Sequence, residues 1–342
     1  MSGFCSGISD PFDNDTLFFV ILAAVSQECM QYLGEIISLV VAVMWTATAL
    51  FADQASHRIG AMSTNVFRMV FSAMLLAALL WIAIGRPYPA FADGATLLWM
   101  GLSALVGYVF GDFCLFNSYI VIGARFGQLF MTLAPPFAAI AGWALLGETL
   151  SWKSWLAMAV TLTGIAISIL VRSQDGGHKL TLKLPLKGIL LGIGAGLGQG
   201  VGLVLSKIGM QHYAAALPAD APAAFSWAMP FASTMIRSLT GTAGFLLLMA
   251  LTGSLGQLRG AMHNRAGMKF TALTTLFGPF IGVSLSLMAV QYARAGIAST
   301  LMALTPVLIL FPYALIYKQK ITPKEILGVT VSMTGVALFF LL

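Results

Sequence analysis

Long apolar runs separated by short charged segments dominate the chain. Most runs approach the roughly 20 residues that a helix needs to cross the hydrocarbon core of a bilayer. The pattern therefore predicts an all-α polytopic membrane protein. We expect ten transmembrane helices, at residues 36–52, 66–84, 96–118, 126–146, 154–171, 188–206, 230–252, 270–291, 296–317 and 325–342.

Composition supports a location in the membrane. Of the 342 residues, 59% are hydrophobic and 9% are charged, whereas an ordinary globular protein has roughly 25% charged residues. The basic residues behind the net charge of +6 lie in short loops, where membrane topology and lipid headgroups explain them better than nucleic acid does. We expect a multi-pass protein of the cell (inner) membrane, with the lipid bilayer as its partner and no nucleic acid. Assembly into a homo-oligomer stays open.

Two polar segments divide the chain. Residues 1–33 form an N-terminal extension, in which the apolar stretch Asp15–Met30 lacks the basic n-region of a signal peptide. We favour an extension upstream of the functional start over a partial extra span. Residues 172–187 are rich in Gly and Lys and lie near the midpoint, which indicates a linker. The longest internal loop is expected at about Lys207–Trp227.

The two halves of the chain are related. A shift of 171 residues aligns residues 102–171 with 273–342 without a gap, and the predicted second spans match after a small shift. We therefore predict two five-helix repeats, residues 34–171 and 188–342. Because five is odd, the second repeat must cross the membrane in the opposite sense, as in the inverted repeats of secondary transporters. Matching pairs include Gly107 with Gly278, Gly111 with Gly282, Met131 with Met302, Pro135 with Pro306, Gly164 with Gly335, and Arg68 with Arg237.

Pro135 and Pro306 occupy equivalent positions in the predicted fourth and ninth spans. A proline inside a helix removes a hydrogen bond and kinks the chain. One interpretation is that the pair breaks two symmetry-related helices at mid-membrane, with the freed carbonyl groups facing a substrate cavity. The other is that neighbouring groups satisfy the backbone, as they do around many transmembrane prolines.

The ends of both repeats carry a recognisable pattern, "LAPPFAAIAGWALLGETLSWKSWLAMAVTLTGIAI" and "LTPVLILFPYALIYKQKITPKEILGVTVSMTGVAL". At these residues the chain resembles the EamA family of the drug/metabolite transporter superfamily. The resemblance implies ten helices and the export or uptake of small metabolites. Lys318 and Gln319 replace Gly147 and Glu148 in the second unit, so the resemblance carries no role that needs this glutamate in both halves.

An acidic residue lies inside the predicted third span. A carboxylate there costs roughly 2.5–3.5 kcal/mol on insertion scales, so Asp112 should face a cavity or a partner. At helical spacing Tyr108, Asp112, Phe116 and Tyr119 share one face, which suits a cationic or aromatic substrate or proton coupling. The alternative is a salt bridge from Asp112 to one of two arginines, Arg68 or Arg237. The repeat position of Asp112 is Val283.

Other polar and small residues receive structural interpretations. Arg68 and Arg237 lie at the starts of the predicted second and seventh spans, where snorkelling to headgroups is favoured over substrate binding. Trp45 and Gln199 are cavity candidates for which packing is the commoner role, and Glu148 and Lys153 are assigned to capping and loop solvation. Two glycine ridges in the sixth span, Gly192–Gly196–Gly200 and Gly194–Gly198–Gly202, permit close helix contact.

The chain shows no pattern typical of catalysis. We expect His57, His178, His212 and His263 in loops without metal spacing, and Cys5, Cys29 and Cys114 lack such spacing as well. Neither a catalytic triad nor a phosphate-binding loop is visible, so we predict no cofactor and no enzymatic activity. The leading hypothesis is a secondary transporter that moves a small-molecule substrate by alternating access. The alternative is a non-transporting sensor or assembly subunit on the same fold.

The basic residues also bear on orientation. Most of them, including Arg58, Arg172, Lys187, Arg259 and Arg265, fall in the odd-numbered loops. The positive-inside rule places these loops in the cytoplasm and therefore both ends of the bundle outside. The usual habit of the resembled family, a cytoplasmic N-terminus, implies the opposite. We favour the charge argument.

Overall fold

The computed structural model describes residues 32–172, 185–222, 224–308 and 323–341, and all regular structure in these residues is helical. The first half contains α2 (Leu33–Ile59), α3 (Ala61–Ile84), α4 (Gly94–Ala104), the π-helical segment η1 (Leu105–Asp112), α5 (Phe113–Met131), α6 (Ala134–Leu146) and α7 (Trp152–Arg172). The second half contains α8 (Leu186–Ala215), α9 (Phe225–Leu251), α10 (Gly256–His263), α11 (Arg265–Thr275), the π-helical η2 (Leu276–Val283), α12 (Ser284–Tyr292), α13 (Ala295–Met302), α14 (Thr305–Leu308) and α16 (Pro323–Leu341).

Seven helical segments of the described residues are long and apolar enough to cross a membrane. Two shorter apolar helices, Trp152–Ile167 and Ile326–Leu338, add to them. The predicted ninth span is described only as far as α14, because residues 309–322 lie outside the described part. The all-helical, multi-pass character is thus confirmed. Most of the N-terminal extension and of the linker at 172–187 also lies outside the described residues.

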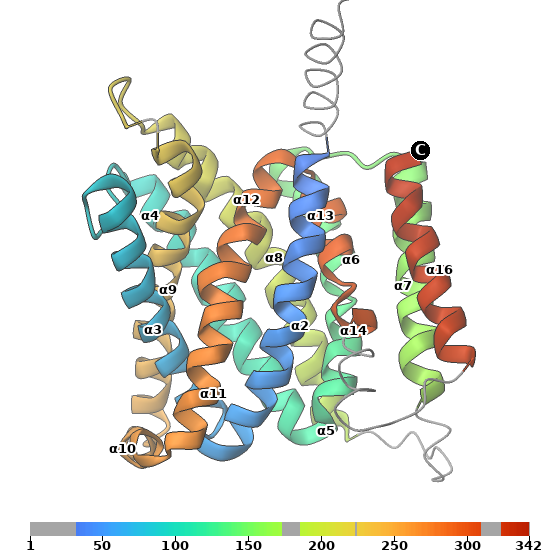
Figure 1. Ribbon diagram of the computed structural model, residues 1–342, viewed down its shortest axis with the longest axis horizontal. Helices are drawn as coiled ribbons and strands as arrows, with labels where there is room; N and C mark the ends of the chain where they lie inside the picture. Colours follow the sequence, from blue (N-terminus) through green and yellow to red (C-terminus); the bar gives the residue numbers. More distant parts are fainter. Residues whose placement is uncertain (1–31, 173–184, 223, 309–322, 342) are drawn as a thin grey trace, which may run out of the picture.

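The two halves run in opposite directions through the bundle. In Figure 1, α2 begins at the end of the molecule where the C-terminus lies and runs toward the end where α10 lies, whereas α8 runs the other way. The short helix α10 lies across the lower end, beneath the start of α11 (Figure 1). The opposed directions agree with the inverted relation expected from the odd number of helices per repeat.

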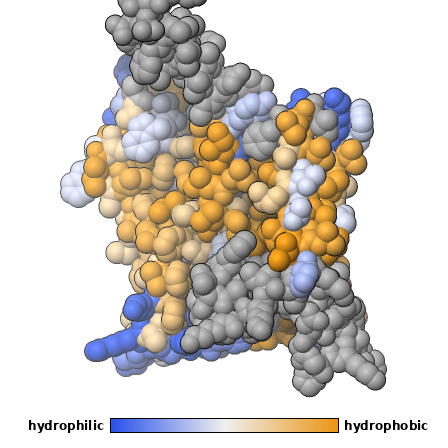
Figure 2. Space-filling model, turned by 45° about the vertical axis from the view of Figure 1, so that its right-hand side comes forward, coloured by the Kyte–Doolittle hydropathy of each residue, from blue (hydrophilic) through white to orange (hydrophobic). Residues whose placement is uncertain are grey.

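Apolar side chains cover the outside of the bundle, and many small polar side chains are buried within it. Trp81, Ile82 and Trp143 are among the exposed large apolar residues, whereas Ser63, Thr64 and Ser233 are fully buried. Figure 2 shows the apolar belt across one face, with hydrophilic residues gathered at the lower edge. Such a surface requires the lipid bilayer as its solvent, since an apolar belt of this extent is not stable in water.

Helices α7 and α16 pair along their lengths at the side of the bundle (Figure 1). A Cβ atom on Gly164 would overlap Ser332, and one on Gly335 would overlap Thr161. Because both contacts interchange under the shift of 171 residues, the pair is symmetric about the axis that relates the repeats. Small residues permit this close packing of helix backbones in a membrane.

Several predicted boundaries are wrong. Helix α8 continues to Ala215, so Lys207 lies in a helix instead of starting a long loop. The continuation is possible because the Lys207 ammonium is paired with Glu148 instead of with water. Of the histidines expected in loops, His57, His212 and His263 lie in the last turns of α2, α8 and α10, where the negative end of the helix dipole favours a positive charge. His178 lies outside the described residues.

Candidate functional site

Two helices are interrupted at equivalent positions near the middle of the bundle. Helix α5 ends at Met131 and α6 begins at Ala134, while α13 ends at Met302 and α14 begins at Thr305. The same turn bridges both interruptions: Leu133 N–H donates to the Phe130 carbonyl (3.0 Å) and Leu304 N–H to the Leu301 carbonyl (3.2 Å). Under the shift of 171 residues the two breaks coincide.

Pro135 follows the first break directly, in the first turn of α6. A proline is tolerated there because the missing N–H has no helical partner in any case. Pro306 holds the same place in α14. The prolines therefore begin new helix segments after a break, which explains why they recur in two apolar runs. Their position confirms the interruption that the repeated prolines suggested.

The π-helical segments η1 and η2 also coincide under the shift, residue for residue. Each contains a glycine pair that lies against a helix of the other repeat: Gly111 approaches Gly198 of α8, and Gly282 approaches Trp45 of α2. A Cβ on Gly198 would lie 2.6 Å from the Gly111 Cα, so this crossing requires glycine. Single π-helical turns are frequent at functional sites.

The predicted glycine ridges of α8 serve two different neighbours. Gly194, Gly198 and Gly202 lie against Cys114, Gly111 and Gly107, whereas Gly192, Gly196 and Gly200 lie against the stretch from Phe130 to Ala138. Helix α8 is thus in backbone contact with η1 on one side and with the first broken helix on the other. This brings the Gln199 side chain, which lies between the ridges, to the centre of the molecule.

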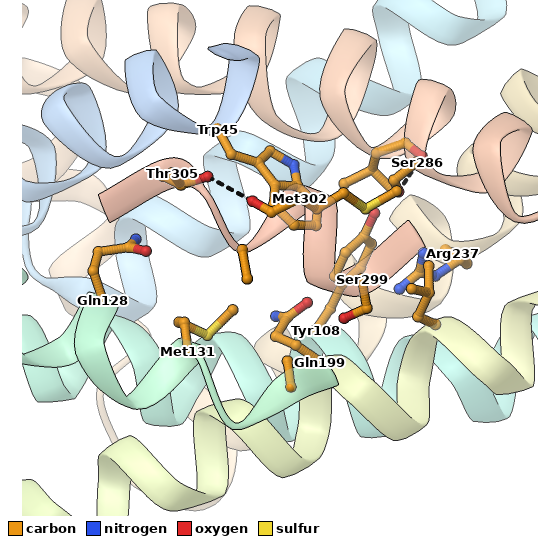
Figure 3. Close-up of a pocket in the computed structure, with 14 residues that line it drawn as sticks. Trp45, Tyr108, Gln128, Met131, Gln199, Arg237, Ser286, Ser299, Met302 and Thr305 are labelled. Carbon is orange, nitrogen blue, oxygen red and sulfur yellow. Dashed lines mark hydrogen bonds between the residues drawn. The ribbon is translucent and has the colours of Figure 1, made fainter. Parts of the chain in front are cut away.

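Two adjoining cavities lie where the broken helices, the π-helical segments, α2 and α8 meet (Figure 3). Each has an empty volume of about 590 Å³, part of which is open to solvent. In Figure 3, Gln128 and Arg237 stand at opposite ends of the lining and Trp45 covers one side. Residues that line both cavities are Trp45, Tyr108, Gln128, Met131, Gln199, Val283 and Thr305.

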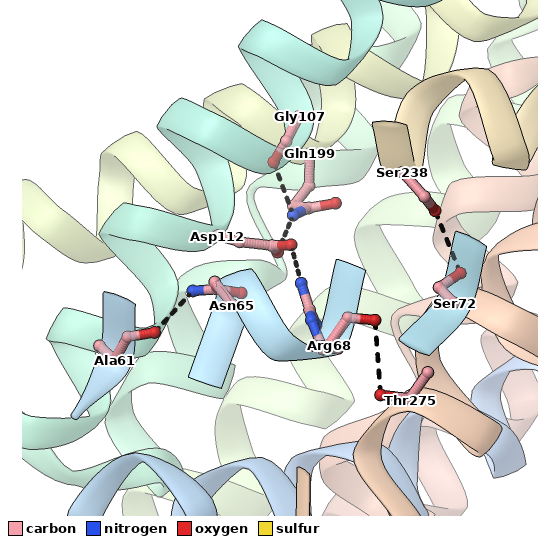
Figure 4. A network of polar contacts seen from close by, with 9 residues as sticks. All are labelled: Ala61, Asn65, Arg68, Ser72, Gly107, Asp112, Gln199, Ser238 and Thr275. Atoms are coloured by element: carbon pink, nitrogen blue, oxygen red, sulfur yellow. Dashed lines mark hydrogen bonds and ion pairs between the residues drawn. The ribbon is translucent and has the colours of Figure 1, made fainter. Parts of the chain in front are cut away.

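A polar network joins both repeats at the cavity wall (Figure 4). Arg68 of α3 forms an ion pair with Asp112 of η1. The Gln199 Nε2 donates to the Asp112 Oδ1 at 2.7 Å and to the Gly107 carbonyl at 3.1 Å. The Arg68 guanidinium also lies 4.7 Å from the ring centre of Phe116. Asp112 is therefore neutralised by an arginine, as the salt-bridge alternative proposed.

The snorkelling prediction for Arg68 and Arg237 is wrong. Helix α3 begins at Ala61 and α9 at Phe225, so each arginine lies at least about two turns inside its helix. Arg68 is 5% exposed and Arg237 is 3% exposed. Uncharged polar residues such as Asn65 extend the helices beyond the apolar runs, and the apolar runs alone had placed the starts too late.

The predicted face of Tyr108, Asp112, Phe116 and Tyr119 lines one of the cavities as a group. The Tyr119 hydroxyl accepts a 2.5 Å hydrogen bond from Gln128 Nε2. Trp45 and Gln199 line both cavities, beyond the packing role favoured for them. Pro135 is buried in α6 and does not line a cavity, although Met131 and Ala134 before it do. The Pro306 side chain lies outside the described part of the chain.

Some lining residues were not predicted. Gln128, Ser286, Ser299 and Thr305 carry polar groups at the cavity, and Met131 and Met302 line it as an equivalent pair. The only signal in the sequence was the identity of the two methionines in the repeat. Hydroxyl side chains in apolar helices commonly bond the helix backbone, as Thr305 does to the Met302 carbonyl at 3.0 Å (Figure 3).

A second polar cluster joins the repeats away from the cavity. The Lys207 Nζ lies 2.7 Å from Glu148 Oε1 and donates to the Ala293 carbonyl at 2.8 Å. The other carboxylate oxygen of Glu148 accepts from Ala295 N–H at 3.0 Å, at the start of α13. Glu148 is thus a link between the two repeats and not a solvated loop residue. No group of three or more His, Cys, Asp or Glu side chains that could hold a metal occurs in the part of the chain that the structure describes.

Comparisons with known proteins agree with this arrangement. The sequence profile described as the EamA-like transporter family matches residues 32–170 and 186–341. A crystal structure described only as that of a protein is similar with a TM-score of 0.65 and 16% sequence identity, over 90% of this chain and 96% of the other. At this identity the likeness concerns the fold alone. No curated protein sequence matches the chain.

Proposed function

Since the chain belongs to the EamA-like transporter family, we propose that it is a secondary transporter of the cell (inner) membrane. Its ten helices form two inverted five-helix repeats that bind one small solute in the central cavity. The repeats expose the cavity to the two sides of the membrane in turn. No cofactor takes part, and the energy comes from a solute or ion gradient.

The observation that carries the proposal is the pair of equivalent helix breaks at one cavity. Met131 and Met302, at the two breaks, both line it. In secondary transporters with inverted repeats, discontinuous helices meet at the substrate site because interrupted backbone is tolerated only where it faces protein or a water-filled space. The cavity is lined by both repeats, so a movement of one repeat against the other changes its access.

The apolar and polar parts of the lining support a small organic solute. Trp45, Met131, Met302 and Leu203 provide apolar surface, while Gln128, Gln199 and Arg237 provide polar groups that fix orientation. A mostly apolar pocket with a few convergent polar groups is typical of small-molecule sites. Neither of the two cavities carries a cluster of acid, base and nucleophile that would indicate an enzyme.

Cysteine labelling tests the alternating access. In a variant with Cys5, Cys29 and Cys114 replaced by serine, Met131→Cys and Met302→Cys are each exposed to a membrane-impermeant thiol reagent from one side of a vesicle and then from the other. We expect both to react, and from both sides over time. Leu76→Cys, at a fully buried core position, is the control and should stay unreactive. Cysteines at 131 and 302 that react from neither side would overturn the proposal.

A transport measurement separates a transporter from the non-transporting alternative. Purified protein is screened by thermal shift against amino acids, nucleosides, cationic drugs and sugars, and each stabilising compound is then tested for counterflow in proteoliposomes. Labelled solute should accumulate only in vesicles that contain the protein and unlabelled solute. Binding without any movement would instead identify a sensor or assembly subunit.

A further inference from the structure

The charges at the cavity do not balance. Among the residues that line the two cavities, the charged ones are Arg68, Asp112 and Arg237. Asp112 is paired with Arg68 and accepts a hydrogen bond from Gln199. One arginine more than the carboxylate can pair with is therefore present, and the excess positive charge persists whichever protonation state Asp112 adopts.

Arg237 is the unpaired cation. Its side chain is 3% exposed, and among the described residues no carboxylate lies within ion-pair distance of it. Its guanidinium carbon lies 4.4 Å from the ring centre of Tyr108. The Arg237 Nε and the Tyr108 hydroxyl are both buried without a hydrogen-bond partner. In Figure 3 the guanidinium is turned toward Tyr108 and Ser299, in the cavity lining.

The repeat symmetry shows where the counter-charge is missing. Arg68 and Arg237 are equivalent, and the partner of Arg68 is Asp112. The position equivalent to Asp112 is Val283, which lines the same cavity as Arg237. The second repeat has kept the arginine without the carboxylate. An uncompensated charge inside a membrane protein is costly and is typically functional.

We propose that Arg237 anchors the anionic group of a small monoanionic organic solute, an organic carboxylate with an apolar body. A guanidinium suits this group because its fork of N–H donors matches a carboxylate. The Tyr108 hydroxyl provides a further unpaired donor beside it, and Trp45 and Met302 provide apolar surface for the body. The start of α6 at Ala134 lines the same cavity, and the positive end of its dipole adds to the attraction.

This inference rests on the proposed function and replaces the expectation of a cationic substrate. That expectation came from the acidic and aromatic face around Asp112, whose charge Arg68 satisfies. The aromatic rings that were expected to receive a cationic substrate instead stack with the two arginines, Phe116 with Arg68 and Tyr108 with Arg237.

Matched probes test the charge preference. Purified protein is titrated with benzoate, 3-phenylpropionate and hexanoate, and with the amide and the amine that correspond to each. We expect at least one carboxylate to bind, with its amide and amine binding at least about tenfold more weakly, which is the effect of losing a charge-assisted hydrogen bond. Failure of all three carboxylates to bind, or equal binding of a carboxylate and its amide, would overturn the inference.

Three variants locate the anion. Arg237→Gln removes the cation and should weaken carboxylate binding by about ten- to a hundredfold. Val283→Asp supplies the missing partner of Arg237 and should weaken it similarly, whereas Val283→Asn, of the same size without charge, should stay within about threefold of the wild type. Equal affinities of the Asp and Asn variants would contradict the proposed role of Arg237.

A stability measurement without ligand excludes a merely structural role. If Arg237 is kept for ligand binding, Arg237→Gln should leave the thermal midpoint of the empty protein unchanged or raise it, because a buried unpaired charge is removed. A lowered midpoint would indicate a packing role. The proposals also separate in proteoliposomes. Movement of amides or amines but not carboxylates would leave the transport function standing and defeat this inference, whereas carboxylate binding without movement would do the reverse.

Discussion

At the scale of single residues, the charged side chains inside the bundle divide into two kinds. Asp112 and Arg68 satisfy each other, with Gln199 completing the carboxylate's hydrogen bonds. Arg237 has an aromatic ring beside it but no carboxylate among the described residues. A buried pair tolerates neither partner alone, because removing one leaves an uncompensated charge. The first kind therefore contributes to stability, and the second is available to a solute.

Asp112→Asn tests the first kind. The substitution should destabilise the protein by about 3–5 kcal/mol, because it leaves Arg68 buried without its counter-charge. Arg68→Met should be similarly destabilising. The double variant should lose less than the sum of the two, since no charge is left unpaired. Thermal unfolding of detergent-purified variants measures the effect. Additive losses would show that the ion pair does not couple the two side chains.

At the scale of elements, the functional unit is the broken helix and not any single proline. The turn at 132–133 and its equivalent at 303–304 bring the Met131 and Met302 side chains to the cavity. The π-helical segments repeat in the same way and bring η1 against α8 and η2 against α2. These interruptions cost helix hydrogen bonds, and a membrane protein retains them where the backbone meets protein or a cavity.

Pro135→Ala and Pro306→Ala test the breaks. Alanine restores an N–H group and favours a continuous helix, so the turn should close and the preceding methionine should move away from the cavity. We expect at least a severalfold slower reaction of Met131→Cys and Met302→Cys, respectively, with a water-soluble thiol reagent. Pro136→Ala is the matched control, because its repeat position is Val307 and not proline. A reaction rate that is the same in all three variants would contradict the role of the repeated prolines.

The ion pair between Glu148 and Lys207 links the repeats at the end of the bundle where the C-terminus lies (Figure 1). Alternating access requires such contacts to break in one of the two states. Lys207→Met should therefore favour the state that is open at this end, and Met302→Cys should react faster from that side. Glu148→Gln should act in the same direction, and the double variant no more strongly than either single one. Unchanged labelling in all three would show that the ion pair does not hold this end closed.

At the scale of the whole molecule, the two repeats build one bundle with distinct ends. The lower end in Figure 1 contains α10 and carries the basic residues Arg58, Lys187, Arg259, Arg265 and Lys269. The other end contains the first described turn of α2 and the last of α16. The uneven distribution of positive charge decides which end faces the cytoplasm.

A reporter fused after Leu342 tests the orientation. If the basic end is cytoplasmic, the C-terminus faces the periplasm, so an alkaline phosphatase fusion should be active and a green fluorescent protein fusion dark. Fusions after Lys187 should show the opposite result and serve as the internal control. A fluorescent fusion at Leu342 would instead support the cytoplasmic N-terminus that is usual in the family.

The sequence alone was enough to determine the class, the repeat and the symmetric helix breaks. Apolar runs of membrane length and matching glycines and prolines are local properties of the chain, and the shift of 171 residues carried them from one half to the other. It also predicted that Asp112 needs a cavity or a partner, because the cost of a carboxylate in the bilayer does not depend on the fold.

Only the tertiary structure decided which arginine pairs with Asp112. Arg68 and Arg237 are equivalent in sequence, and both lie about equally far from any feature that would distinguish them. In the fold, Arg68 meets the carboxylate and Arg237 meets Tyr108, opposite the valine that replaces the acid. The difference arises because pairing depends on distances between helices that are far apart in the chain. Helix packing sets those distances, and the hydrophobic pattern of a single helix does not contain them.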